Sequence, residues 1–242
     1  GTAIVTAAGL LNALELQNKT LEQAVIVCAG AGAAGLTTMH LLIQLGASKK
    51  NIFVVDSQGV IHSKRTNLNP YKFGFALDTE KRTLADALQG ADVFVGVSAP
   101  DILTAEMLKT MQKKPVVFAL ANPDPEIKPA FAHKTRNDLI MATGRSDYPN
   151  QVNNILVFPF IFRGALDVRA SDINMEMQLA AVQALRALAK QPIPEKIKNA
   201  YGLTHLEFGP NYILPKPMDP RLKETVAAAV AQAARDSGIA AI

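Results

Sequence analysis

The sequence predicts an α/β fold: a doubly wound parallel sheet with flanking helices and a C-terminal helical extension. Short apolar runs alternate with helix-like stretches along residues 21–170, and one run leads directly into a glycine-rich turn, VIVCAGAGAAGLTTMH. Strands that are apolar along their whole length are typical of parallel sheets covered on both faces. After residue 170, helical patterns replace the strands. We therefore expect a leading buried helix at 1–20, a core at 21–170 and a helical extension at 171–242.

Five apolar runs predict the strands of the sheet, and they occupy 24–29, 51–56, 92–98, 115–122 and 138–144. Helical periodicity lies between them. One helix follows the glycines and ends at Gly46, and shorter ones occupy 82–90 and 104–112. Residues 57–80 hold Gly, Asn and Pro with weak periodicity, so we expect them to be mostly loop.

The first helix, TAIVTAAGLLNALEL at 2–16, is apolar on nearly every side. Such a helix requires burial all round, so we expect a domain outside this chain to cover it. Thr2 is expected to cap its start. Because the sequence has no initiator methionine, we expect it to be a piece of a longer protein.

The C-terminal part begins with NNILVFPFIFRGALDV at 153–168, which is expected to be buried apolar structure. A long helix is predicted at 173–190, followed by a Pro-rich irregular stretch. The last helix is expected to have Asp219 as its cap, Pro220 in its first turn and Gly238 beyond its end.

Composition excludes several classes of protein. The net charge is +4, but Lys and Arg are scattered, so we expect no nucleic-acid surface. The apolar runs are shorter than the ~18 residues that a membrane-spanning helix needs. Residues 1–16 lack the basic start of a signal peptide. Cys28 is the single cysteine, so no intrachain disulfide can form, and a reducing, cytoplasmic location is expected.

The glycine turn follows the G-x-G-x-x-G pattern with Gly30, Gly32 and Gly35, between a predicted strand and a predicted helix. Asp56 stands 21 residues after Gly35, at the end of the next strand, which is the arrangement of a Rossmann-type dinucleotide site. Gly30 permits the tight turn, Gly32 lets the backbone approach the pyrophosphate, and Gly35 allows close packing of helix and strand. The alternative is a Rossmann-like turn without a nucleotide.

The choice between NAD and NADP depends on the charges after the second strand. A carboxylate at Asp56 binds ribose hydroxyls and repels a 2′-phosphate, which slightly favours NAD. Lys64, Arg65 and Lys72 lie in the loop that follows. They can reach a phosphate, or they are ordinary exposed cations.

Polar residues follow the later strands, at the sheet edge where ligands of doubly wound folds bind. Ser98 and Ala99 follow the third strand, at the height expected for the nicotinamide ribose. Asn122 follows the fourth strand, and Asn153 and Asn154 follow the fifth. Their amides suit a hydroxy acid carboxylate or a ribose; alternatively, each caps its own loop. No histidine spacing suits a metal, and no Ser/His/Asp set or carboxylate pair is evident, so we expect no catalytic or metal-binding residue in this chain.

Six stretches together resemble the NAD(P)-binding half of bacterial malic enzymes, over essentially the whole chain. They are GTAIVTAAGLLNAL, GAGAAG, VVDSQGVI, FALANPDPEI, GRSDYPNQVNNILVFPFIFRGALDV and FGPNYILPKPMDPRL. The resemblance implies an NAD(P)-dependent, decarboxylating malate dehydrogenase. Such an enzyme oxidises L-malate at C2 by hydride transfer to the cofactor and then releases CO2 to give pyruvate. Mg or Mn polarises the C2 oxygen in the full-length enzyme.

The resemblance also implies roles for individual residues. The turn residues and Asp56 are cofactor contacts, with Ala33 and Ala34 added to the glycines. Asn122 and Asn154 match malate-contacting asparagines, and Asn122 also lies beside the cofactor. Asn153 and Thr2 match residues near the nicotinamide.

The family's tyrosine acid, lysine base, substrate arginine and metal ligands belong, by the same resemblance, to an N-terminal malic domain absent from this sequence. We therefore expect this chain alone to bind cofactor without turning over malate. Its expected partners are that domain and further copies of itself, since family members are usually homo-oligomers. The sequence does not decide whether a phosphotransacetylase-like domain follows.

Two other functions stay open on the sequence. One is the cofactor domain of a different dehydrogenase, such as an amino-acid dehydrogenase, which the GRSDYPNQVNN stretch argues against. The other is a non-catalytic NAD(P)-sensing module, which has no need of Asn122 and Asn154.

Overall fold

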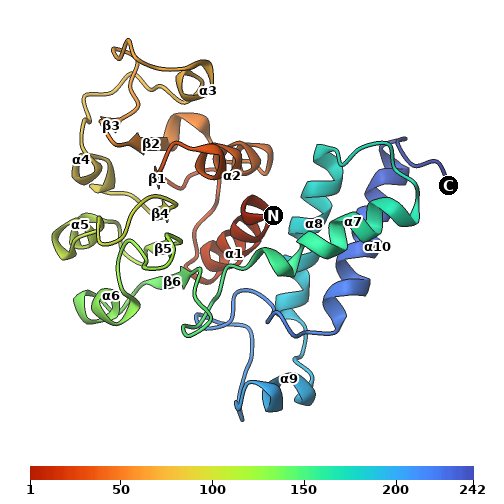
Figure 1. The fold of residues 1–242 in the computed structure, drawn as a ribbon. Helices are drawn as coiled ribbons and strands as arrows, with labels where there is room; N and C mark the ends of the chain where they lie inside the picture. Colours follow the sequence, from red (N-terminus) through yellow and green to blue (C-terminus); the bar gives the residue numbers. More distant parts are fainter. The chain divides into compact units, whose positions relative to one another are not determined.

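The computed structural model describes residues 1–242 and contains a six-stranded sheet in the order β3-β2-β1-β4-β5-β6 (Figure 1). The strands are β1 Ile26–Ala29, β2 Ile52–Asp56, β3 Gly59–Val60, β4 Val93–Gly96, β5 Val116–Ala119 and β6 Ile140–Thr143. All pair in parallel except β3, which is antiparallel to β2. The predicted doubly wound α/β fold is confirmed. Its strand order reverses between β1 and β4, where such folds hold their ligands.

The chain divides into two compact units. The sheet unit comprises residues 13–149, and the helical unit comprises residues 1–12 and 150–242. Besides the strands, the sheet unit holds α2 Ala33–Gln44, η1 Lys49–Asn51, α3 Pro70–Phe73, α4 Leu84–Leu88, α5 Ala105–Thr110 and α6 Pro129–Thr135. The helical unit holds η2 Asn154–Leu156, α7 Phe158–Asp167, α8 Met175–Lys190, α9 Glu195–Ala200 and α10 Arg221–Asp236. Helix α1, Thr2–Leu16, begins in the helical unit and ends in the sheet unit. The expected boundaries at residues 20 and 170 stay a prediction.

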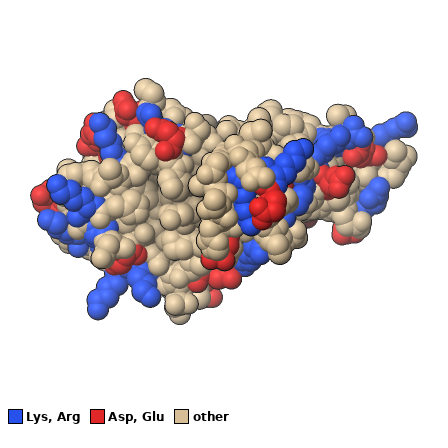
Figure 2. All heavy atoms as spheres, turned by 90° about the horizontal axis from the view of Figure 1, so that it is seen from below, with Lys and Arg blue, Asp and Glu red and all other residues tan.

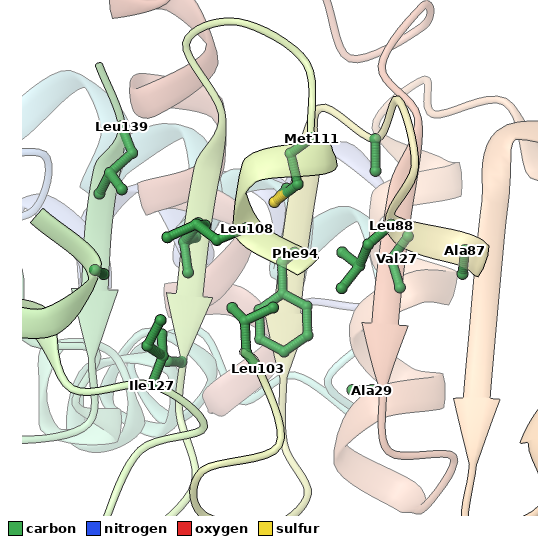
Figure 3. Close-up of a cluster of buried hydrophobic side chains, with 14 of the residues drawn as sticks. Val27, Ala29, Ala87, Leu88, Phe94, Leu103, Leu108, Met111, Ile127 and Leu139 are labelled. Atoms are coloured by element: carbon green, nitrogen blue, oxygen red, sulfur yellow. The ribbon is translucent and has the colours of Figure 1, made fainter. Parts of the chain in front are cut away.

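The core of the sheet unit explains why its strands are apolar throughout. Every residue of β1, β4, β5 and β6 is buried. Helices α4, α5 and α6 cover one face and α2 covers the other (Figure 1). Phe94 of β4 points into the cluster under the first of these faces, near Leu103 and Val27 (Figure 3). Burial on both faces fixes the strand register and brings the strands' carboxyl ends to one edge.

Helix α10 ends where the sequence predicts, whereas its N-cap position is occupied by Pro220 and not by Asp219. The Asp219 carboxylate accepts a hydrogen bond from the backbone N–H of Arg221 at 3.0 Å, and Pro220 immediately precedes the helix. Gly238, just past the end, has a left-handed φ of 77°.

Helix α1 was expected to be covered by a domain outside this chain, and the structure differs. Most of its apolar side chains are already buried in this chain, namely Ala3, Ile4, Val5, Ala7, Ala8, Leu10, Ala13 and Leu14. The polar Asn12 is buried too, and its amide donates to the carbonyl of Ile213 at 2.9 Å. A further domain is therefore not required to cover α1. Thr2 is itself the first residue of α1 rather than its cap, and its hydroxyl donates to Asn154.

Helix α7 also differs, because 153–168 was expected to be buried. Ile161 and Ala165 are buried, and α7 packs closely on α10 at Gly164, where an added Cβ would lie 2.5 Å from the Ala227 carbonyl oxygen. An adjacent stripe of the helix is exposed, with Phe158 at 51% and Leu166 at 73%. Apolar residues recur around this helix, whereas the chain covers only one side of it.

Some short elements were not predicted from the sequence. Strand β3 and helix α3 interrupt the expected loop at 57–80, and α9 lies within the expected irregular stretch. Lys and Arg form small groups among Asp and Glu on the face drawn in Figure 2. None of the helices combines the length and apolar character needed to cross a membrane.

Candidate cofactor site

The glycine turn joins β1 to α2, and its three glycines have different reasons to lack a side chain. Gly30 has φ of 119°, and a Cβ there would lie 2.8 Å from the Val97 carbonyl oxygen. A Cβ on Gly35 would lie 2.0 Å from the carbonyl oxygen of Gly30. By contrast, no atom lies within 4 Å of a Cβ placed on Gly32. The chain's own packing thus requires Gly30 and Gly35, while Gly32 faces open space.

Helix α2 begins directly behind that space. Gly32 is its N-cap and offers no side chain to the first N–H groups of the helix. Ala33 and Ala34 in the first turn are exposed and equally small. The unpaired N–H groups and the helix dipole therefore present hydrogen-bond donors and partial positive charge to an anion in front of Gly32.

Asp56, at the end of β2, is bound by two cations. Arg65 contacts both carboxylate oxygens, with Nη1 2.9 Å from Oδ1 and Nη2 2.8 Å from Oδ2. Lys72 of α3 lies 3.0 Å from Oδ2. The side chains of Asp56 and Arg65 are 8% and 9% exposed, and that of Lys72 is 28% exposed. The sequence placed these cations in the loop but did not reveal that they pair with the acid.

The pKa of Asp56 reflects this pairing. Burial alone raises the pKa of the carboxyl, but the hydrogen bonds from Arg65 and Lys72 outweigh it and lower the pKa from 3.8 to about 2. A carboxyl with a depressed folded pKa stabilises the fold above its unfolded pKa, and the contribution disappears as pH falls through the folded value.

We expect Asp56→Asn to lower the free energy of unfolding by about 2 kcal/mol at pH 7, since a pKa unit corresponds to about 1.4 kcal/mol. The difference between variant and wild type should shrink as pH falls from about 4 to 2, where the wild-type carboxyl becomes protonated. Urea unfolding of both proteins across this range measures it. A difference that stays constant with pH would contradict the ion-pair explanation.

The loops after β4 and β5 carry further predicted contacts of the sheet unit. Ser98 and Ala99 are exposed in the first loop. Asn122 is exposed in the second, where its amide makes no hydrogen bond within the chain. A Cβ on Gly144, just after β6, would lie 3.4 Å from the amide of Asn122, so this glycine leaves room for it. The Asn122 amide is therefore available to a ligand.

The predicted contacts in the helical unit form a small group of their own. The Thr2 hydroxyl donates to the side-chain oxygen of Asn154 at 2.8 Å. The oxygen of Asn153 accepts from the backbone N–H of Ile155 at 3.1 Å and so caps η2. Capping accounts for Asn153, whereas Asn154 keeps the two donors of its amide nitrogen. That these residues meet Asn122 at one rim stays a prediction.

Glu126, in the loop between β5 and α6, is a residue that the sequence reading missed. It is 0% exposed, and its carboxylate accepts from the backbone N–H groups of Ser98 at 3.2 Å and Ala121 at 2.9 Å. Burial raises the pKa of this carboxyl. Acids are rarely buried completely, and nothing in the local sequence NPDPEI distinguishes this one from a surface residue.

Residues 1–201 match the protein family described as Malic enzyme, NAD binding domain. The chain belongs to this family. An NADP-dependent malic enzyme of Halomonas elongata is 60% identical over 240 residues, which cover 99% of this chain and 57% of that protein. An NAD-dependent malic enzyme of Rhizobium meliloti is 48% identical over 241 residues, or 99% of this chain and 31% of that protein. The crystal structure of Entamoeba histolytica malic enzyme has a TM-score of 0.88 at 38% identity, covering 100% of this chain and 49% of that one.

This malic enzyme NAD-binding domain thus spans 57% of the Halomonas protein's length and 31% of the Rhizobium protein's. The family confirms the resemblance and the NAD(P)-binding role inferred from the sequence. It also rejects the alternative of an amino-acid dehydrogenase domain. No group of three or more His, Cys, Asp or Glu side chains in residues 1–242 is arranged to hold a metal ion.

Proposed function

We propose that this chain is the cofactor-binding domain of an enzyme that oxidises L-malate to pyruvate and CO2 with NADP as hydride acceptor. The observation that carries the proposal is the glycine turn, in which Gly32 and the first turn of α2 face open space. Family membership and the 60% identity to an NADP-dependent malic enzyme support it. The turn residues Gly30, Gly32, Ala33, Ala34 and Gly35 hold the pyrophosphate in this proposal.

The other proposed ligand contacts come from the loops after the strands and from the helical unit. Ser98 and Ala99 line the nicotinamide ribose, and Thr2 and Asn153 lie on the nicotinamide side. The amides of Asn122 and Asn154 bind malate, and Asn122 also touches the cofactor. Mg or Mn, which polarises the C2 oxygen of malate in the whole enzyme, is held in this proposal by residues of the N-terminal malic domain, as the family resemblance implies.

The pairing of Asp56 shifts the preferred cofactor from NAD, which the sequence slightly favoured, to NADP. A free carboxylate repels a 2′-phosphate, but Arg65 and Lys72 together bring one more positive charge than Asp56 neutralises. A phosphate monoester carries a charge of about −2 at neutral pH and is attracted to such a group. Lys72 is more exposed than Arg65, so we propose that its ammonium contacts the 2′-phosphate. Relatives with either cofactor occur, so the names alone do not decide.

Titration of the chain with NADP and with NAD tests this proposal. We expect NADP to bind more tightly, and Lys72→Ala to weaken NADP about tenfold, or about 1.4 kcal/mol, by removing one ion pair with the phosphate. NAD, which lacks the phosphate, should bind within about twofold of wild type. Lys50→Ala serves as the control, since Lys50 is exposed at the opposite end of β2. Tighter binding of NAD by wild type, or an equal loss for both cofactors, would reject the NADP preference.

The proposed partners are an N-terminal malic domain of the same protein and further copies of the enzyme in a homo-oligomer. Since the chain itself buries α1, the exposed apolar side of α7 is the surface of the helical unit that a malic domain would cover. This chain alone is proposed to bind cofactor without turning over malate. We propose the cytoplasm as the location of the enzyme, since the single thiol, Cys28, suits a reducing compartment.

A further inference from the structure

Glu126 is a buried acid without a cationic partner. Its side chain is 0% exposed, and its hydrogen bonds come from the backbone. Burying a carboxylate is costly unless its lone pairs are satisfied, so a residue of this kind needs a reason beyond packing. The nearest polar groups of the site are those of the two loops to which it is bonded.

These two loops belong to neighbouring strands. Strands β4 and β5 pair in parallel, with Gly96 opposite Ala119, and their loops separate beyond that pair. One oxygen of Glu126 binds the N–H of Ser98 in the first loop, and the other binds the N–H of Ala121 in the second. The Glu126 side chain therefore joins the two loops beside Ser98 and Ala121, beyond the last sheet hydrogen bond. Farther along the loops, the backbone N–H groups of Asp101 and Leu103 donate to the carbonyls of Pro125 and Glu126. Ser98 and Asn122, the residue after Ala121, are the proposed ribose and malate contacts of these loops.

Gly96 at the end of β4 makes room for the carboxylate. A Cβ on Gly96 would lie 2.4 Å from both the carboxyl carbon and Oε2 of Glu126, and 2.8 Å from its Cγ. Because Glu126 is enclosed, it cannot swing away from such a methyl group. The strand thus ends in the one residue that permits this side chain in this position.

The chemistry of the link requires a carboxylate. Two N–H donors face Glu126, and an ionised carboxyl offers only acceptors. A glutamine of the same shape has one acceptor and an NH2 group, so one donor of the pair would face another donor. The substitution Glu126→Gln therefore breaks one side of the link with almost no change in volume.

We propose that Glu126 is a positioning residue that holds the loops after β4 and β5 together and so shapes the nicotinamide half of the cofactor site. The adenosine half is built on the glycine turn, α2 and Asp56, none of which hydrogen-bonds to the Glu126 side chain. The inference rests on the proposed function, because it assigns the nicotinamide to these loops. Because the inference concerns only the nicotinamide half of the cofactor, it can be tested by comparing ligands that contain this half with ligands that lack it.

The test compares NADP with 2′,5′-ADP, which carries only the adenosine half of the cofactor, by calorimetric titration of the chain. We expect Glu126→Gln to weaken NADP about tenfold and to leave 2′,5′-ADP within about twofold, since one charged hydrogen bond to the loops is lost. Gly96→Ala, which leaves Glu126 in place but displaces its carboxylate, should reproduce this selective loss. It also serves as the second variant if Glu126→Gln does not fold. Glu106→Gln is the matched control, because Glu106 is an exposed glutamate of the neighbouring α5.

Selective loss of NADP affinity in either variant supports the inference. Equal weakening of both ligands would assign Glu126 to the stability of the fold and overturn it, as would unchanged NADP affinity. A wild-type chain that binds neither ligand would overturn the proposed function and the inference with it, and so is distinguished from failure of the variants alone.

Discussion

Replacing Gly35 by alanine is expected to abolish NADP binding and to destabilise the sheet unit. The added Cβ would lie 2.0 Å from the carbonyl oxygen of Gly30 and 3.2 Å from the thiol of Cys28. The first of these is backbone and the second is a buried side chain, so neither gives way without moving the turn or lifting α2 from β1. Overpacking of this kind costs about 3 kcal/mol, and the displaced turn no longer presents its N–H groups together. We expect NADP affinity to fall at least ~100-fold.

Gly32→Ala separates ligand contact from folding at the same turn. No atom lies within 4 Å of its added Cβ, so thermal unfolding should be unchanged, whereas NADP binding should weaken because the methyl group occupies the space of the pyrophosphate. Gly209→Ala is the control, since its Cβ would lie 3.9 Å from the nearest atom, the Glu207 carbonyl oxygen. Calorimetry and thermal unfolding of the three variants measure both effects. Wild-type NADP affinity in Gly32→Ala would place the pyrophosphate elsewhere.

The sequence predicts the sheet well because the burial of a parallel sheet on both faces requires a recognisable pattern of residues. Strands buried on both faces are continuous apolar runs, and the glycines mark the turn between β1 and α2. The same argument fails for α7. Its apolar residues have the density of a core segment, but which side the chain covers depends on α10, more than fifty residues later in the sequence. Apolar content alone does not tell an interior helix from one with an uncovered side.

The site was less predictable, because its partners come from segments without periodicity. Arg65 and Lys72 stand 9 and 16 residues after Asp56, in a stretch that the sequence predicts as loop. Without their positions, the acid looked free and favoured NAD. Glu126 binds a backbone N–H of Ser98, 28 residues away, and a backbone partner of this kind has no sequence signature.

In the full-length enzyme, Asn154→Ala is expected to lower kcat/KM for malate at least ~100-fold and to leave NADP affinity within about twofold. The side-chain oxygen of Asn154 is occupied by the Thr2 hydroxyl at 2.8 Å, so the group left for a ligand is the amide nitrogen with its two donors. Donors without a partner on an exposed side chain suit the carboxylate of malate. Asn137→Ala is the control, since Asn137 is exposed and precedes β6, at the opposite end of the sheet. Steady-state turnover of malate and separate NADP titration measure the two effects, and unchanged turnover would show that Asn154 does not bind malate.

Thr2→Val tests whether the orientation of the Asn154 amide matters in addition to the hydrogen bonds that the amide donates. The variant keeps the amide donors but removes the hydroxyl that fixes the side-chain oxygen, so the amide is free to turn. We expect a loss of about tenfold in kcat/KM, smaller than that of Asn154→Ala, because the donors are retained and only their alignment is lost. Combining the two substitutions should add nothing to Asn154→Ala, since Thr2 acts only through that amide. An additive loss in the double variant would mean that Thr2 touches a ligand directly, as the family resemblance implies for the nicotinamide side.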